Sequence, residues 1–216
     1  LGLKTDLPRY PSILLGAVPL SPFNVAEMYQ TIASNGFVMP LRSIEAVNDA
    51  HGNLLSSYGM EGRQEVSPQT MQWLRWGLEQ VTENGTARAL KGHIPLPIAA
   101  KTGTSNDQRD AWSMGFDNRH LGIVWVGRDD NEPMPLFGST AALPIWLESF
   151  KSLGVEPLAP ATGFGWVKVN DQGEFVEERC AGMLYPLPKN QMPTELNGCG
   201  KSHKQEKRKS WLDWLF

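Results

Sequence analysis

The stretch Ile98–Phe116, IAAKTGTSNDQRDAWSMGF, decides the fold of this chain. It opens with an apolar run, ends that run in Lys-Thr-Gly-Thr at 101–104, and then enters the polar segment Ser105–Arg109. Asp110–Phe116 alternates large side chains with small ones, and the apolar run HLGIVWVG follows at 120–127. A period of two, interrupted by short polar connections, predicts three sequential antiparallel strands.

The sequence Lys-Thr-Gly-Thr is poorly suited to a core strand and well suited to the edge of a site that binds an anion. Lys101 supplies a positive charge, and Thr102 and Thr104 supply short hydroxyl donors. Gly103 has no side chain, so a ligand can lie against the backbone. Backbone N–H groups there can stabilise a developing oxyanion, and an exposed edge can pair with an extended peptide. The simpler alternative is a strand end that runs into a loop.

Two helices are predicted before this stretch, and both carry the same start and stop signals. Ser21 and Ser67 can cap helices that begin with proline, and Asn-Gly at 35–36 and at 84–85 ends them. Each helix has an apolar stripe. In the first helix Val25, Met28, Tyr29 and Ile32 fall on one face. In the second, Met71, Leu74, Leu78 and Val81 are expected to form the buried stripe.

Other elements are predicted on either side. A hairpin is expected around His51-Gly52, and a helix over 139–154 should begin late or bend at Pro144. After Gly154 a Pro/Gly-rich linker leads to a second hairpin around Gln172-Gly173.

Composition excludes several classes of protein. The 216 residues are 41% apolar and 20% charged with a net charge of −3, which is typical of a globular domain and offers no field for nucleic acid. The four histidines are scattered and no Cys/His cluster occurs, so neither a metal site nor a cofactor is predicted. Cys180 and Cys199 lie in a turn-rich region; by themselves they fit two reduced thiols or a stapling disulfide.

Five pieces of the sequence, in order, carry a family resemblance over roughly 1–154. The chain resembles the C-terminal part of the transpeptidase domain of a bifunctional, class A penicillin-binding protein, most similar to the 1b type. The pieces are LLGAVPLSPFNVAEMYQTIASNG, NGTARAL, KTGTSNDQRDAWSMGF, IVWVGRDDN and STAALPIW. The implied fold is α+β, part of the penicillin-binding-protein and serine β-lactamase-like fold, with an antiparallel sheet that carries Lys101 at one edge and is flanked by helices.

The resemblance implies peptidoglycan D,D-transpeptidation through a serine acyl-enzyme. Lys101 matches the lysine that holds the substrate carboxylate and supports proton transfer, and the Thr104 N–H matches an oxyanion donor. The hydroxyls of Thr102 and Thr104 match those that bind the carboxylate of the substrate or drug. Gly103 matches the residue that lets the acyl group lie against the strand, and Ser105 and Asn106 have weaker substrate-side roles. Asp110 and Trp112 match positions that organise the next strand. The implied partners are peptidoglycan stem peptides, β-lactams as inhibitors, and outer-membrane lipoprotein activators or divisome proteins.

The sequence departs from the family mainly in two motifs that it lacks. A smaller departure is Ala100, where relatives often have glycine, although alanine should be tolerated in a strand. Neither Ser-x-x-Lys, which holds the family's nucleophile, nor its second motif Ser-x-Asn occurs. We therefore expect the serine, a glycosyltransferase domain and a membrane anchor before Leu1, and a location at the periplasmic face of the inner membrane. The 216 residues alone should not react with a β-lactam. Because thiols oxidise in that compartment, the resemblance also favours a Cys180–Cys199 disulfide.

Three segments are expected: the transpeptidase part at 1–154, a linker with the hairpin and cysteine pair at 155–200, and a basic and aromatic tail at 201–216. The tail fits an interfacial membrane helix, or a segment that packs on the body or on a partner; its short length favours the second. The core should lie in or near Ile32, Leu78, Trp112, Ile123 and Trp125.

Two other functions stay open. A serine β-lactamase or β-lactam sensor shares the fold and a similar strand, but the pieces of the bifunctional type before and after the motif argue against it. Attack by water also needs a positioned base, and this segment offers no candidate. A non-catalytic peptide-binding or scaffolding module would follow if the complete protein lacked Ser-x-x-Lys.

Overall fold

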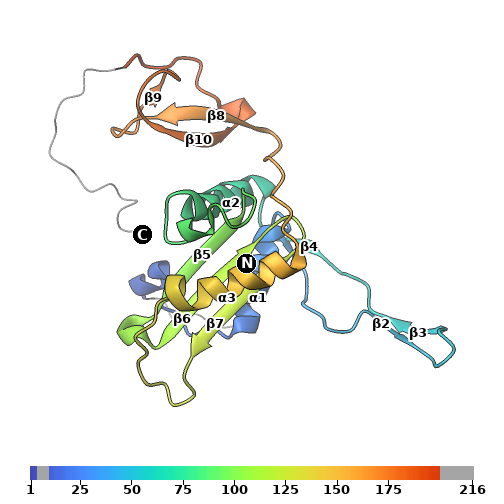
Figure 1. Ribbon diagram of the computed structural model, residues 1–216. Coiled ribbons are helices and arrows are strands. Elements are labelled where there is room, and N and C mark those ends of the chain that lie inside the picture. Colours follow the sequence, from blue (N-terminus) through green and yellow to red (C-terminus); the bar gives the residue numbers. More distant parts are fainter. Residues whose placement is uncertain (4–9, 200–216) are drawn as a thin grey trace. The chain divides into compact units, whose positions relative to one another are not determined.

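The computed structural model describes residues 1–3 and 10–199 and divides into two compact units, Leu1–Leu158 and Ala159–Phe216 (Figure 1). The division follows Leu158 because this side chain is buried and its N–H donates to the carbonyl of Pro97 at 2.9 Å. The segments expected at 1–154, 155–200 and 201–216 remain predictions, and the tail at 201–216 lies outside the described residues.

The first unit is built on the predicted meander of three strands. Strands β5 (Ala99–Thr104), β6 (Asp110–Phe116) and β7 (Leu121–Gly127) pair antiparallel in the order β5-β6-β7 (Figure 1). Lys101 lies opposite Met114, and Gly103 lies opposite Trp112. Among the described strands, β5 is therefore an edge of this sheet, as predicted.

Two helices begin at a capping serine followed by proline, and a third begins late, at its proline. In α1 (Pro22–Ala33) the Ser21 hydroxyl accepts the N–H of Asn24 at 3.2 Å, and in α2 (Pro68–Glu83) Ser67 accepts that of Thr70 at 3.1 Å. The third helix, α3 (Leu143–Leu153), starts late with Pro144 in its first turn, after the π-helical turn η4 (Gly138–Ala142). All three starts agree with the sequence.

Two buried clusters, each with side chains on β5, form the core. One contains Ala99 and the buried face of α1, and the other contains Ala100 and α3. Trp146 stacks on Phe150 with ring centroids 3.7 Å apart and donates from Nε1 to the carbonyl of Gly122 at 3.1 Å. A Cβ at Gly122 would lie 2.6 Å from the Phe150 ring, so this glycine lets α3 rest directly on β7.

Two of the core predictions are wrong. Leu74 is 38% exposed: it lies roughly 60° around α2 from Met71, at the margin of the buried stripe. Trp125 is 40% exposed because it lies near the end of β7, and the cluster around α1 includes Leu121 and Ile123 of that strand but not Trp125. Ile32 and Leu78 are buried, and Trp112 and Ile123 are partly buried against the same cluster.

Short elements complete the first unit. The hairpin predicted around His51-Gly52 is present as β2 (Ala46–Asn48) and β3 (Leu54–Ser57). The remaining elements are β1 (Phe37–Val38) paired with β4 (Arg63–Gln64), and the 3₁₀ turns η1 (Pro11–Leu15), η2 (Arg88–Leu90) and η3 (Asn106–Gln108).

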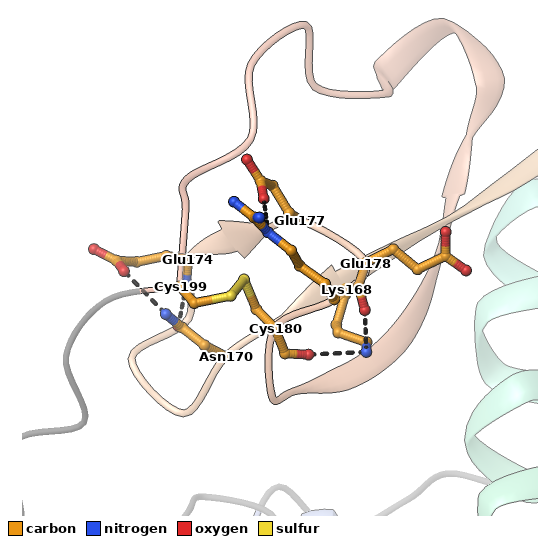
Figure 2. The surroundings of a disulfide bond; sticks show 8 residues. Lys168, Asn170, Glu174, Glu177, Glu178, Cys180 and Cys199 are labelled. Atoms are coloured by element: carbon orange, nitrogen blue, oxygen red, sulfur yellow. Dashed lines mark hydrogen bonds and ion pairs between the residues drawn. A yellow bond between two sulfur atoms is a disulfide. The ribbon is translucent and has the colours of Figure 1, made fainter.

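The second unit is a small antiparallel sheet closed by a disulfide. Strands β8 (Phe164–Val169), β9 (Phe175–Val176) and β10 (Met183–Pro188) have the order β10-β8-β9, and the turn η5 (Lys189–Gln191) follows. The β8–β9 pair is the hairpin predicted around Gln172-Gly173. The expected Cys180–Cys199 bond is present, with Cα atoms 5.1 Å apart. Lys168 donates from Nζ to the carbonyl of Cys180 at 2.9 Å and so supports the bridged loop (Figure 2).

Candidate functional site

The candidate site is the polar half of β5, which continues from a buried half. Ala99 and Ala100 are completely buried, Lys101 and Gly103 are partly buried, and Thr104 is exposed. The transition takes place within one strand, so the core positions of the alanines fix the backbone of the residues that follow.

Lys101 is a partly buried cation. Its Nζ donates to the carbonyl of Thr102 at 2.7 Å, and no carboxylate in the described ranges forms an ion pair with it. Desolvation lowers the pKa of Lys101 below the usual lysine value. A lysine in this state can both attract an anion and take part in proton transfer.

The pairing pattern directs backbone donors of β5 to its free edge. The N–H of Ser105 donates to the carbonyl of Asp110 at 3.0 Å, so this is a hydrogen-bonded pair. Because hydrogen-bonded and non-bonded pairs alternate in an antiparallel ladder, Thr102 and Thr104 point their N–H and C=O groups away from β6. The bond from Lys101 to the Thr102 carbonyl agrees with this assignment. The Thr104 N–H thus faces outward, where an oxyanion donor would be needed.

The Thr104 hydroxyl is held from the side by the turn before α3. The N–H of Gly138 donates to Thr104 Oγ1 at 3.1 Å. A hydroxyl that accepts this bond keeps its own hydrogen for a further acceptor. Thr104 therefore retains one side-chain donor in addition to its backbone N–H.

The Thr102 hydroxyl has a different environment. Thr102 is 6% exposed, and its Oγ1 lies 2.6 Å from Oγ1 of Thr86, a residue on the loop after α2. Either hydroxyl can be the donor. The pair has two hydrogens and uses one internally, so one O–H remains for another acceptor.

Ser105 and Asn106, given weaker substrate roles by the sequence, lie in the turn between β5 and β6. Ser105 Oγ accepts the N–H of Asp110 at 2.8 Å and so closes that turn, whereas Asn106 is exposed in η3. Asp110 accepts a hydrogen bond from Trp125 Nε1 at 2.9 Å, and the rings of Trp112 and Trp125 lie 6.3 Å apart. Asp110 and Trp112 therefore connect β6 to β7.

Sequence reasoning overlooked two residues that contact the threonines. Thr86 belongs to the quoted piece NGTARAL but received no role, and Gly138 precedes the piece STAALPIW. A hydroxyl directly after a helix-ending Asn-Gly was a usable signal for Thr86. The contact of Gly138 depends on the packing of η4 and had no local signal.

The arrangement gathers a cation, hydroxyl donors and an outward N–H along one strand edge. Such a set can bind a carboxylate and stabilise an oxyanion. Within residues 1–3 and 10–199, no group of three or more His, Cys, Asp or Glu side chains is placed to hold a metal ion. Over the same residues, no helix combines the length and the apolar character needed to span a bilayer.

A family match covers much of the first unit. Residues 12–127 match the family described as penicillin binding protein transpeptidase domain. The chain is 35% identical to penicillin-binding protein 1B of Haemophilus influenzae over 175 residues, which is 80% of this chain and 22% of that protein. It is also 35% identical to penicillin-binding protein 1B of Escherichia coli over 188 residues, 86% of this chain and 22% of that protein. The chain thus spans about a fifth of the length of these relatives.

Solved structures show the same fold. Penicillin-binding protein 1A from Haemophilus influenzae is similar with a TM-score of 0.74 and 17% identity, over 88% of this chain and 35% of that one. Penicillin-binding protein A from M. tuberculosis, in a ceftriaxone acyl-enzyme complex, is similar with a TM-score of 0.51 and 24% identity, over 62% of this chain and 32% of that one.

Proposed function

Because the chain belongs to the penicillin-binding protein transpeptidase family, we propose that it supplies one wall of a serine D,D-transpeptidase site. The observation that carries this proposal is the polar half of β5, where Lys101, the Thr104 N–H and the two threonine hydroxyls share one strand edge. The substrate is the D-Ala–D-Ala end of a peptidoglycan stem peptide, and β-lactams occupy the same place as inhibitors.

Each residue has a role in this proposal. A serine outside these 216 residues attacks the penultimate carbonyl carbon, and the carbonyl oxygen becomes an oxyanion that accepts the Thr104 N–H. Lys101 and the hydroxyls of Thr102 and Thr104 hold the terminal carboxylate, and Lys101 supports the transfer of the serine proton. The bond from that carbon to the nitrogen of the terminal D-Ala breaks, and D-Ala leaves as an amine that has taken up the serine proton. The amine of a neighbouring stem then attacks the acyl carbon, the ester bond to the serine breaks, and a proton of the incoming amine returns to the serine oxygen. Gly103 leaves room for the acyl group, with weaker contacts from Ser105 and Asn106.

Membership of the same family also suggests the composition and location of the complete protein. We propose a bifunctional cell-wall synthase with a glycosyltransferase domain and a membrane anchor before Leu1, located at the periplasmic face of the inner membrane. Its partners are peptidoglycan strands and, as activators, outer-membrane lipoproteins or divisome proteins.

Labelling with a fluorescent penicillin tests the proposal. The natural polypeptide that contains these residues should form a covalent adduct that unlabelled penicillin prevents, and the isolated 216-residue chain should form none. An adduct on the isolated chain would show that the serine has been misplaced. A folded natural polypeptide that forms no adduct would overturn the transpeptidase assignment and favour a scaffolding module.

A further inference from the structure

The loop after α2 places one hydroxyl at the edge of β5. In the segment NGTARAL, at 84–90, Thr86 is exposed, yet its Oγ1 lies 2.6 Å from Oγ1 of the buried Thr102. The two residues belong to different elements and are 16 positions apart in the sequence. Their contact therefore depends on how the loop is held.

Glycine and alanine on either side of Thr86 fix the loop. The N–H groups of Gly85 and Ala87 both donate to the carbonyl of Val81, at 3.1 and 3.2 Å. A Cβ at Gly85 would lie 2.9 Å from Val81 Cα, so only glycine lets the chain turn this closely over the helix end. Ala87 is completely buried in the cluster that contains Ala100. Thr86 thus stands between two anchored neighbours.

The helix itself is joined to β5. Thr82, in the last turn of α2, is completely buried, and its Oγ1 lies 2.7 Å from the carbonyl oxygen of Glu79 and 3.1 Å from that of Ile98, so its one hydrogen is shared between the helix and β5. Val81 packs in the same cluster as Ile98. The C-terminal end of α2, from which the Thr86 loop continues, is therefore packed closely against β5, the strand that carries Thr102.

We propose that Thr86 is a positioning residue for carboxylate recognition at this edge. In this arrangement Thr86 donates to Thr102 Oγ1 and so fixes the rotation of the Thr102 hydroxyl, whose own hydrogen donates to the carboxylate of a stem peptide or β-lactam beside Lys101. Without Thr86, the buried Thr102 hydroxyl would turn to another acceptor, such as a backbone carbonyl, and lose this orientation. The inference rests on the proposed transpeptidase function and adds a residue that the motif Lys-Thr-Gly-Thr does not contain.

The test compares acylation by benzylpenicillin and by its methyl ester in the natural polypeptide. Thr86→Val should slow acylation by the free acid about tenfold, the usual effect of one hydrogen bond to a charged group. It should slow acylation by the ester less than about twofold, because the ester has no carboxylate to orient. Thr86→Ser keeps the hydroxyl and should restore the free-acid rate to within about twofold of wild type.

Two controls separate this role from a purely structural one. Thr70→Val removes a similar contact at the other end of α2, where Thr70 Oγ1 lies 2.8 Å from Ser67 Oγ, and should leave the acid-to-ester ratio unchanged. In a Thr102→Val background, Thr86→Val should add little further loss. If Thr86→Val folds poorly, Thr86→Ala takes its place. The ratio of acylation rates for free acid and ester, measured on its folded fraction, gives the same comparison.

The outcomes are distinct. Equal slowing of acid and ester by Thr86→Val, or no slowing of either, overturns the role of Thr86 while the transpeptidase assignment stands. A wild-type polypeptide that forms no covalent adduct overturns the assignment itself and this inference with it.

Discussion

The two halves of β5 differ in burial and in chemistry, although they are one continuous strand. Ala99 and Ala100 are completely buried between two core clusters, whereas Lys101 is partly buried and Thr104 is exposed. Alanine has no side-chain rotamers to order, so burying this half costs no side-chain entropy. The apolar half therefore holds the polar half in place. The polar half can then carry a partly buried cation and hydroxyl groups, which do not themselves favour folding.

The largest expected effect concerns the polar half alone. Lys101→Met in the natural polypeptide should reduce the rate of acylation by penicillin about 10²–10⁴-fold, because it removes both the carboxylate partner and the proton-transfer group. The rate is measured by stopped-flow competition with a fluorescent penicillin. A loss below about threefold would mean that the Lys101 side chain does not take part in acylation, even if β5 lies at the active site.

A second substitution tests whether the polar half depends on its packing. A Cβ at Gly138 would lie 2.4 Å from the carbonyl oxygens of both Gly103 and Trp112, so Gly138→Ala should destabilise by roughly 1–3 kcal/mol. It should also lengthen the bond from the Gly138 N–H to Thr104 and slow acylation. Chemical denaturation measures the loss.

Gly77→Ala is the matched control, because nothing lies within 4 Å of a Cβ at this position in α2. Helix propensity predicts a gain of up to about 1 kcal/mol there. Equal effects of the two substitutions would contradict the close contact between η4 and β5.

The smallest expected effect is a pH-dependent difference in stability between wild type and Lys101→Met. Burial lowers the pKa of Lys101 in the folded state below its unfolded value, so the charged lysine opposes folding at all pH values below the folded pKa. This penalty shrinks as the pH rises from the folded pKa toward the ordinary lysine value. Lys101→Met should therefore be more stable than wild type near pH 7, and its advantage should decrease toward pH 10. A melting-temperature difference that grows with pH would show that Lys101 is not desolvated.

Many elements of this fold can be predicted from local features of the sequence. The serine and proline at 21–22 and 67–68 start helices, Pro144 delays the third helix, and the alternation in Asp110–Phe116 predicts a strand. These features depend on capping, ring geometry and side-chain period, which the sequence displays directly. The Lys101 edge follows from the same reasoning, since a polar end to an apolar strand is not expected inside a sheet.

Other features depend on contacts between distant residues. The segment between the two cysteines was interpreted as a turn-rich loop, yet it contains β10. This strand includes Pro186 and Pro188 and lies at the edge of its sheet, where a missing N–H is tolerated. Leu74 and Trp125 are exposed although the period of their helix and strand places them beside buried residues, so the period alone does not give the width of the buried face. The Thr86–Thr102 contact likewise requires the packing of α2 on β5.

The most direct test of the central claim is a crystal structure of the natural polypeptide with a bound penicillin. The penicillin carboxylate should lie within about 3.2 Å of a threonine hydroxyl of β5, and the acyl oxygen should accept the Thr104 N–H. A covalent penicillin whose carboxylate and acyl oxygen are both bound elsewhere, with the edge of β5 unoccupied, would contradict it.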